Sequence, residues 1–353
     1  MKSTLFNILK IISFSFCFLI MLFFLTWYCK PESYNVDNVR GLKNEKHNSL
    51  DMVYLGGSAA FVYWQPLKAY EDIGIKSYSY ATDTMQAELY ITMIKEVLKT
   101  QSPDLFVIDA RAFQYRDKDQ VPSEVPYRNH LTGMSLNMNK INFINEYIPK
   151  INDGKLSYIF DIIKYHSSDL SQKSIRKSIN LALGKYDNEY KGFYFVPKIE
   201  KIEKYDFDNE EIKKPSEETD KILDELLEYL KQENINCLFV VSPYSETAEH
   251  KAIFNYVENK IKKYNFNFVD ANEYYDEMNL DFNNDFYNNN HVNIYGSEKY
   301  TSFLENYLSN NYYFEVHDDN FNNSWDKYLN NWHKSVSETK KIINGLKGDI
   351  KND

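Results

Sequence analysis

The chain opens with one long apolar segment and continues as short apolar runs that alternate with amphipathic stretches. Residues 11–28 (IISFSFCFLIMLFFLTWY) contain no charged side chain. At a rise of about 1.5 Å per residue, a helix of this length approximates the hydrocarbon thickness of a bilayer, about 30 Å. The pattern predicts one transmembrane helix, so that residues 1–30 form a short stub and an anchor.

The flanks of this segment distinguish an anchor from a cleaved signal peptide. A signal peptide has an apolar region of about 7–15 residues that ends in small side chains. Here the segment is longer and ends in TWYC at residues 26–29, which favours an uncleaved anchor. Lys2 and Lys10 precede it, and this positive charge predicts a cytoplasmic amino terminus and a single-pass protein of the cell membrane. Everything after Lys30 is then extracytoplasmic.

Beyond a polar stretch at 31–49, predicted to be a stalk, the pattern is that of an α/β domain over residues 50–312. Apolar runs predict five strands, at 52–55, 75–80, 105–109, 237–241 and 266–269. Helical periodicity lies between them, which indicates a mostly parallel five-stranded sheet with helices on both faces. In such sheets, ligands bind beyond the carboxyl ends of the strands.

Two segments depart from the alternation. Residues 112–214 are too long for a simple connection, and they are predicted to be an insertion that forms a lid or a substrate wall. Residues 313–353 carry apolar side chains at helical spacing, which predicts an amphipathic helix. Packing of this helix on its own domain is favoured over binding to a partner.

Charge and cysteine content narrow the function. The 353 residues include 41 basic and 51 acidic side chains, for a net charge of −10. Residues 1–30 hold three lysines and no acid, so the remainder carries −13. This acidity argues against a nucleic-acid partner. Three cysteines without CxxC or Cys/His spacing suggest neither a zinc site nor a disulfide framework, and neither GxGxxG nor GxxxxGK[ST] occurs. No metal and no cofactor are expected.

A serine follows the first predicted strand, in the sequence Leu55-Gly56-Gly57-Ser58. Glycines allow a sharp turn and a close backbone approach, so the serine hydroxyl can project at the edge of the sheet. An ordinary strand-end turn or an anion-binding turn is the alternative for this motif taken alone.

A histidine lies in a polar loop before the last helix of the domain, in DFYNNNHVNIYG at residues 285–296. A serine nucleophile needs a base within hydrogen-bond reach, and that base needs an orienting partner. His291 supplies a candidate base, although a surface or capping histidine would fit the loop equally well. The serine and histidine together are more specific than either residue alone.

Ser58, and His291 with Asn293 and Gly296, resemble the motifs of the SGNH (GDSL-type) hydrolase family. The anchor plus ectodomain resembles the membrane-anchored cell-envelope acyl-transfer branch, which includes teichoic-acid D-alanylation and polysaccharide O-acetylation proteins. The resemblance spans residues 50–310 apart from the insertion. It implies a flavodoxin-like SGNH-type α/β fold with Ser58 as the nucleophile and His291 as the general base.

The chain departs from that family pattern at several positions. Gly57 replaces the usual acid before the serine, and Asp109-Ala-Arg111 replaces the segment that carries the oxyanion asparagine. Asn288 stands where an aspartate is usual, three residues before the histidine. Gly57, Arg111 and Asn288 are the predicted oxyanion or substrate-binding residues.

The change at Asn288 leaves three possibilities for the base. Asp285 reaches back to orient His291, or a Ser–His dyad works with a carbonyl partner, or the site is inactive. In serine proteases, exchanging the orienting aspartate for asparagine lowers turnover about 10⁴-fold, largely through the wrong imidazole tautomer.

The function expected from the resemblance is a membrane-anchored, extracytoplasmic serine esterase or O-acyltransferase acting on an acylated cell-envelope glycan or teichoic-acid-like polymer. A membrane-bound acyltransferase is a candidate partner. The alternative is a catalytically weak or inactive SGNH-like envelope protein that binds glycan or assembly partners.

Overall fold

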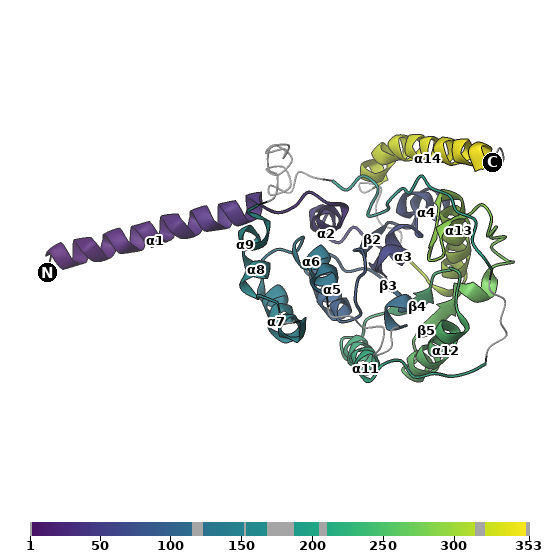
Figure 1. Cartoon of the computed structure of the whole chain (residues 1–353), viewed down its shortest axis with the longest axis horizontal. Helices are drawn as coiled ribbons and strands as arrows, with labels where there is room; N and C mark the ends of the chain where they lie inside the picture. Colours follow the sequence, from purple (N-terminus) through teal and green to yellow (C-terminus); the bar gives the residue numbers. More distant parts are fainter. Residues whose placement is uncertain are drawn as a thin grey trace.

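The computed structural model describes residues 2–114, 123–151, 153–167, 187–204, 210–314 and 322–350. Its centre is a five-stranded sheet in the order β2-β1-β3-β4-β5, with every neighbouring pair parallel (Figure 1). The strands are β1 (Met52–Gly56), β2 (Ser77–Ala81), β3 (Leu105–Asp109), β4 (Cys237–Val241) and β5 (Asn267–Asp270). The α/β class and the five-stranded sheet are confirmed, and each strand lies within two residues of its predicted position.

Alternate residues of each strand belong to two separate hydrophobic cores, one on each face of the sheet. Both faces are therefore buried, which explains the continuous apolar runs in the sequence. On β1, Val53 and Leu55 belong to one core and Met52 and Tyr54 to the other. Helices α5 (Leu89–Val97), α11 (Glu217–Gln232) and α12 (Ala248–Lys263) contribute to the first core. Helices α3 (Ser58–Phe61) and α13 (Ile294–Asn311) contribute to the second. Helix α4 (Pro66–Ile73) contacts β2 and α13.

The strand order places a topological switch point between β1 and β3. The chain runs from β1 to β2 in one direction and then to β3 on the other side of β1. The loops that leave β1 and β3 therefore diverge at their carboxyl ends, where doubly wound sheets bind ligands. Ser58 follows β1, and Asp109 and Arg111 lie at the end of β3.

The amino-terminal helix α1 runs from Lys2 to Tyr28 and projects from the domain (Figure 1). Its segment Thr4–Thr26 is long and apolar enough to cross a membrane. The helix also includes residues 2–10, which come before the uncharged segment 11–28.

The expected polar stalk is instead a packed helix. Helix α2 (Tyr34–Asn44) begins at the Ser33 cap and buries Val36, Val39 and Leu42. Its Asn38 amide donates to the carbonyl oxygens of Ser79 and Ala81, at 2.9 and 3.0 Å. Helix α2 therefore covers the edge strand β2, which would otherwise expose unpaired backbone groups. The polar residues that suggested a stalk include the asparagine that makes this contact.

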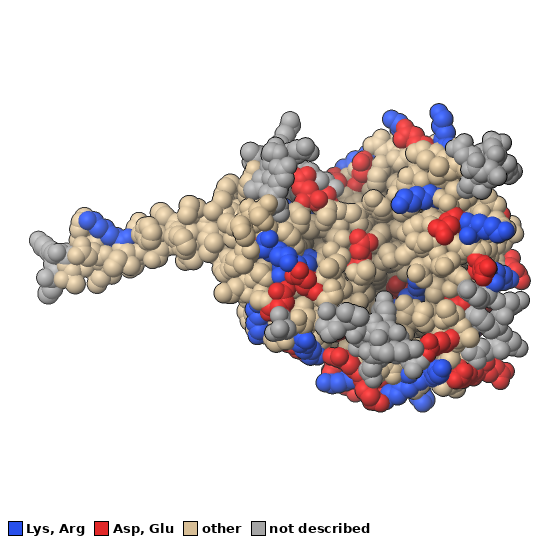
Figure 2. Space-filling model, in the orientation of Figure 1, with Lys and Arg blue, Asp and Glu red and all other residues tan. Residues whose placement is uncertain are grey.

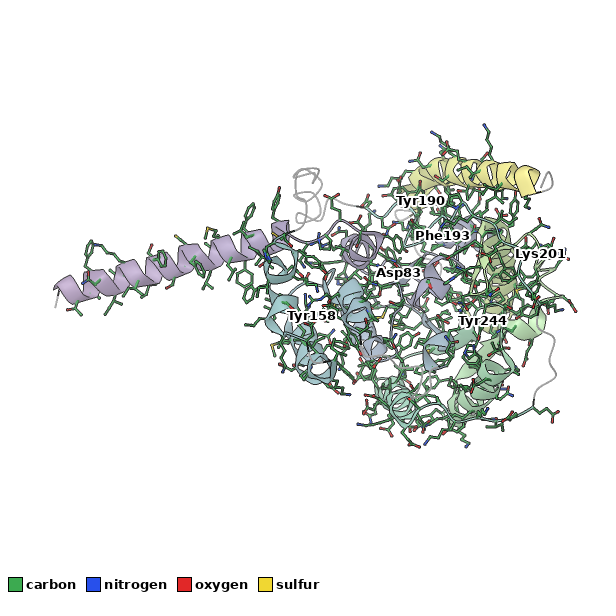
Figure 3. All side chains as sticks on the ribbon, viewed as in Figure 1. Asp83, Tyr158, Tyr190, Phe193, Lys201 and Tyr244 are labelled. Carbon is green, nitrogen blue, oxygen red and sulfur yellow. The ribbon has the colours of Figure 1, made fainter. Side chains whose placement is uncertain are left out.

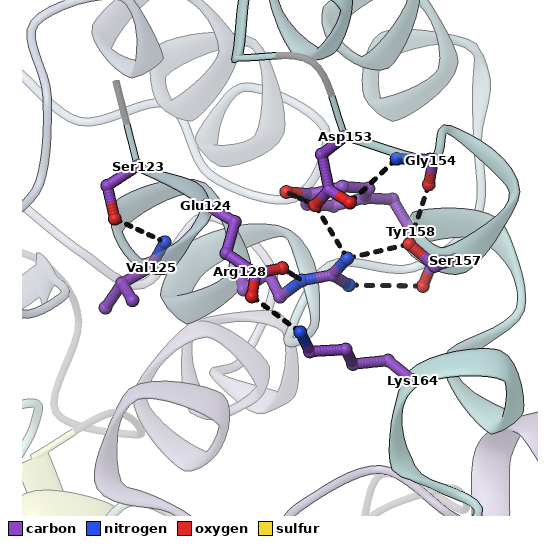
Figure 4. Close-up of polar contacts among 9 residues, drawn as sticks. All are labelled: Ser123, Glu124, Val125, Arg128, Asp153, Gly154, Ser157, Tyr158 and Lys164. Carbon is purple, nitrogen blue, oxygen red and sulfur yellow. Dashed lines mark hydrogen bonds and ion pairs between the residues drawn. The ribbon is translucent and has the colours of Figure 1, made fainter. Parts of the chain in front are cut away.

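The inserted region has a helical part and an extended part. Helices α6 (Glu124–Leu131), α7 (Met138–Tyr147), α8 (Leu156–Ile159) and α9 (Asp161–Tyr165) stack beside the foot of α1 (Figure 1). Arg128 joins α6 to α8 and to the segment before α8, since its guanidinium donates to Asp153 at 2.9 Å and to the Ser157 hydroxyl at 2.7 Å and also pairs with Glu124 (Figure 4). The parts of the insertion at 115–122, 152, 168–186 and 205–209 lie outside the described residues.

The carboxyl-terminal helix α14 (Asn322–Ile350) packs on the domain, as expected. It contacts α4 and α13, and Trp325, Trp332 and Ile343 are buried. Tyr190 and Phe193, from the extended part of the insertion, lie beside it (Figure 3), with their rings 6.2 and 5.2 Å from the Trp332 ring. The helix and the insertion therefore stabilise each other.

Candidate active site

Ser58 and His291 meet at the carboxyl edge of the sheet. Ser58 Oγ lies 2.6 Å from His291 Nε2, although the two residues are 233 positions apart in the chain. Ser58 is the first residue of α3, directly after β1. His291 lies in a two-stranded hairpin, β6 (Phe286–Asn288) and β7 (His291–Val292), which precedes α13. The fold thus brings the predicted nucleophile and base within hydrogen-bond reach.

Asn288 holds the other side of the imidazole ring. Its Oδ1 lies 2.9 Å from His291 Nδ1 and also accepts the backbone N–H of Asn290 at 2.9 Å. A backbone N–H can only donate, so the side-chain oxygen of Asn288, and not its NH₂ group, faces the ring. Nδ1 must then carry the proton, which leaves Nε2 as the acceptor for the Ser58 hydroxyl.

An asparagine at position 288 is expected to weaken the base in two ways, by fixing the wrong imidazole tautomer and by removing a negative charge. This arrangement avoids the first of them. The wrong tautomer arises when the amide NH₂ donates to the imidazole, and the Asn290 N–H prevents that orientation. The missing carboxylate charge is not replaced. Burial, together with the nearby positive charge of Arg111, lowers the pKa of His291 to about 3. The ring is therefore neutral at pH 7 and weakly basic.

Asp285 does not occupy the orienting position proposed for it from the sequence. Its Oδ2 accepts the backbone N–H of Asp281 at 2.7 Å and pairs with Lys299 Nζ at 2.6 Å. Its backbone oxygen would lie 2.5 Å from a Cβ added at Gly296, so this glycine is required where α13 approaches the hairpin. Asp285 thus stabilises the loop that leads to His291, and Asn288 takes the contact with the ring.

Asp109 is a site residue that the sequence analysis did not select. Its buried carboxylate accepts the backbone N–H groups of Arg111, at 3.1 Å, and of Gly57. Burial raises the pKa of Asp109 to about 6, and the Arg111 charge opposes that rise. Gly57 N–H is thereby engaged and does not serve as the predicted oxyanion donor. The sequence feature that could have identified Asp109 is an acidic residue at the end of β3, the strand next to β1.

Three contacts fix the turn that carries His291. The carbonyl oxygen of Asn290 accepts the Tyr63 hydroxyl at 2.8 Å and the Arg111 guanidinium at 2.9 Å. The Ser245 N–H donates to the Asn289 carbonyl at 2.9 Å. Arg111 also lies 4.1 Å above the Tyr244 ring, near the end of β4. Its described contacts place Arg111 beside the base, where it supports the turn.

Candidate oxyanion donors come from the start of α3. The first N–H groups of a helix have no acceptor inside the helix, and Ser58 and Ala59 occupy this position. In serine hydrolases with a strand-to-helix elbow, the N–H of the residue after the nucleophile is one of the oxyanion donors, and Ala59 stands at the corresponding place after Ser58. A Cβ at Gly56 would lie 2.7 Å from Asp109 Cβ, so only glycine permits this turn to sit against β3.

Aromatic side chains form a wall beside the histidine. The Tyr287 ring is stacked on His291, with centroids 5.3 Å apart and planes 8° from parallel. Tyr194, from the insertion, is 47% exposed and packs on Tyr34 and Phe61 at 4.8 and 6.2 Å. Part of the insertion therefore lies next to the turn that carries Ser58.

Comparison with known proteins adds no family assignment. No protein-family model matches the chain, and no curated protein matches it. Among the described residues, no group of three or more His, Cys, Asp or Glu side chains is placed to hold a metal ion.

Proposed function

We propose that this protein is a serine acyl-transfer enzyme of the SGNH type that uses Ser58 as nucleophile and His291 as general base. The observation that supports the proposal most directly is the chain of contacts from Ser58 Oγ to His291 Nε2 and from Nδ1 to Asn288. A serine, a histidine and an oriented amide oxygen reproduce the roles of a catalytic triad, and asparagine serves as the third member in papain-like proteases.

In the proposed reaction, Ser58 Oγ attacks the carbonyl carbon of an ester while His291 Nε2 takes the hydroxyl proton. The tetrahedral intermediate then collapses, and Nε2–H gives that proton to the leaving alcohol oxygen. A water molecule or an acceptor hydroxyl next attacks the acyl-serine as His291 Nε2 removes its proton, and Nε2–H then gives that proton to Ser58 Oγ when the acyl-serine ester breaks. Hydrolysis and transfer differ only in which hydroxyl enters at this last step.

The proposed substrate is an acylated cell-envelope glycan or teichoic-acid-like polymer. The apolar helix Thr4–Thr26 is suited to hold the domain at a membrane, and the −10 net charge argues against nucleic acid. The exposed ring of Tyr194 offers a face on which a sugar can stack beside the Ser58 turn. An extracytoplasmic domain and a membrane-bound acyltransferase partner belong to the same proposal.

The test uses the full chain in detergent and a fluorophosphonate, which forms a covalent bond with an activated serine. We expect labelling of the wild type and loss of labelling in Ser58→Ala and His291→Ala. Ser302→Ala and His333→Ala remove an exposed serine and an exposed histidine, and both should label like the wild type.

Labelling that persists in Ser58→Ala would refute the assignment of the nucleophile. A wild type that neither labels nor cleaves simple esters would favour the alternative, an envelope protein that binds glycan without catalysis. The observation that favours this alternative is the weak basicity of His291, because a weak base activates a serine poorly.

A further inference from the structure

A cavity lies away from Ser58, at the foot of the anchor helix. It measures about 640 Å³ and lies among the end of α1, helix α2 and the inserted helices. Phe23, Thr26 and Lys30 line it from the α1 side. Neither Ser58 nor His291 belongs to its lining, so this cavity is a separate feature of the molecule.

The lining of the cavity carries an excess of positive charge. Five of its residues are basic and two are acidic: Lys30, Arg40, Lys43, Lys99 and Lys140 against Glu96 and Asp161. Figure 2 shows basic side chains where α1 joins the domain, with acidic side chains beside them. Lys99 pairs with Glu96 at the rim, so the excess falls on the inner residues.

The inner cations lie around the carboxylate of Asp161. Lys30 Nζ lies 3.3 Å from Asp161 Oδ2 and donates to the Thr132 carbonyl at 2.7 Å. Lys140 is 2% exposed, and its Nζ donates to the Leu131 carbonyl at 2.6 Å. Within the described part of the chain, the Arg40 guanidinium makes no hydrogen bond or ion pair. Asp161 interacts electrostatically with all three cations, and Asp37 also interacts with Arg40.

Crowding of like charges has a cost that an anion would remove. Burial and the neighbouring positive charge of Lys30 lower the pKa of Lys140 to about 7. Burial also lowers the pKa of Arg40, with Asp37 and Asp161 opposing the shift. Buried charges are ordinarily paired, since desolvation of an unpaired ion is expensive. Because the lining holds five basic and two acidic residues, a bound anion would offset its excess positive charge.

The position of the cavity indicates where that anion comes from. Phe23 and Thr26 are near the end of the apolar segment Thr4–Thr26, so a membrane-inserted α1 places the cavity at the depth of the lipid headgroups. Apolar side chains complete the lining, including Val39, Met134 and Ile159. A charged inner end with apolar walls suits an amphiphile.

We propose that this cavity binds the phosphate group of an anionic membrane lipid, with Arg40, Lys140 and Lys30 as its partners. Arginine and lysine side chains are the usual phosphate ligands of proteins, and an arginine can make two parallel hydrogen bonds to one phosphate. The site is independent of the proposed chemistry at Ser58.

Native mass spectrometry of the full chain in detergent tests the proposal, with phosphatidylglycerol, phosphatidylcholine and glycerol phosphate as the three probes. We expect phosphatidylglycerol to bind more tightly than the other two. Arg40→Gln and Lys140→Met should each weaken its binding by roughly tenfold or more. Lys46→Gln removes an exposed cation just after α2 and should leave binding unchanged.

Two measurements exclude unfolding as the cause of weaker lipid binding in these variants. Lys140→Met removes a buried cation from a cluster of like charge, so its melting temperature without lipid should not fall. Fluorophosphonate labelling of Ser58 should match the wild type in both cavity variants. Equal binding of the two lipids, or lipid binding that survives both substitutions, would overturn the site. Glycerol phosphate that binds as tightly as phosphatidylglycerol would overturn its assignment to a lipid.

Discussion

Replacing Asn288 by aspartate changes the charge beside His291 while keeping the size of the side chain. The Asn290 N–H and the His291 Nδ1–H can both donate to the new carboxylate, as they now donate to the amide oxygen. The substitution therefore isolates the electrostatic contribution of the third member of the proposed triad.

The magnitude follows from the distance. Two unit charges about 4 Å apart attract by about 4 kcal/mol at an effective dielectric constant of about 20. Asn288 is half-buried, so solvent screening reduces this value. An opposite charge at this range commonly shifts a pKa by about 1–3 units. We expect the His291 pKa to rise from about 3 to roughly 4–5. The proposed transition state carries an imidazolium, so labelling or turnover should rise roughly 10–100-fold.

The rate of fluorophosphonate labelling as a function of pH measures both effects. The neutral imidazole is the active form, so the rate falls as pH drops through the pKa of His291. Asn288→Asp should move this acid limb to higher pH and raise the plateau. Asn289→Asp is the matched control, because it adds the same charge to an exposed position of the same turn. An unchanged acid limb and plateau in Asn288→Asp would refute the orienting role of position 288.

Three further substitutions test the surroundings of the site, with Gly154→Ala as a common control because a Cβ there meets nothing within 4 Å. Gly56→Ala places a Cβ against Asp109 and should lower the free energy of unfolding by about 1–3 kcal/mol in denaturant titrations; wild-type stability would contradict the close packing. Asp285→Asn should lower stability by about 1–3 kcal/mol without moving the acid limb of labelling, and a shifted limb would restore Asp285 as the orienting acid. Trp332→Ala should cost about 3–5 kcal/mol and expose α14 to protease, whereas unaltered proteolysis would mean that this helix is not docked.

The sheet could be predicted from the sequence because parallel strands buried on both faces leave continuous apolar runs. Cys237–Val241 and Leu105–Asp109 were predicted at their observed bounds. Helix α2 was missed because its buried residues include Asn35, Asn38 and Gly41 as well as apolar side chains. Its contact with the sheet is made by Asn38, a residue whose polarity suggested solvent exposure.

The site was predictable only in part. Ser58 and His291 follow secondary-structure elements whose ends must meet at one edge of the sheet, so their proximity could be inferred. The partner of the ring depends on the path of a four-residue turn, which periodicity does not encode. Asn288 and Asp285 are both close in sequence to His291, and only the hairpin geometry decides between them. The role of Asp109 depends on its contact with Gly57, which is equally local.

The foot of α1 has a mechanical consequence. Lys30 ties the end of the helix to the Thr132 carbonyl, and Phe23 packs against Phe160 of the insertion at 5.8 Å. A flexible tether would let the domain sample a wide volume above a membrane, whereas these contacts would hold it close to one height when α1 is inserted in a bilayer. A polymer attached to the same surface would then be reached only over a thin layer. On the proposed function, modification by this domain would then depend on distance from the bilayer rather than extend evenly along the polymer.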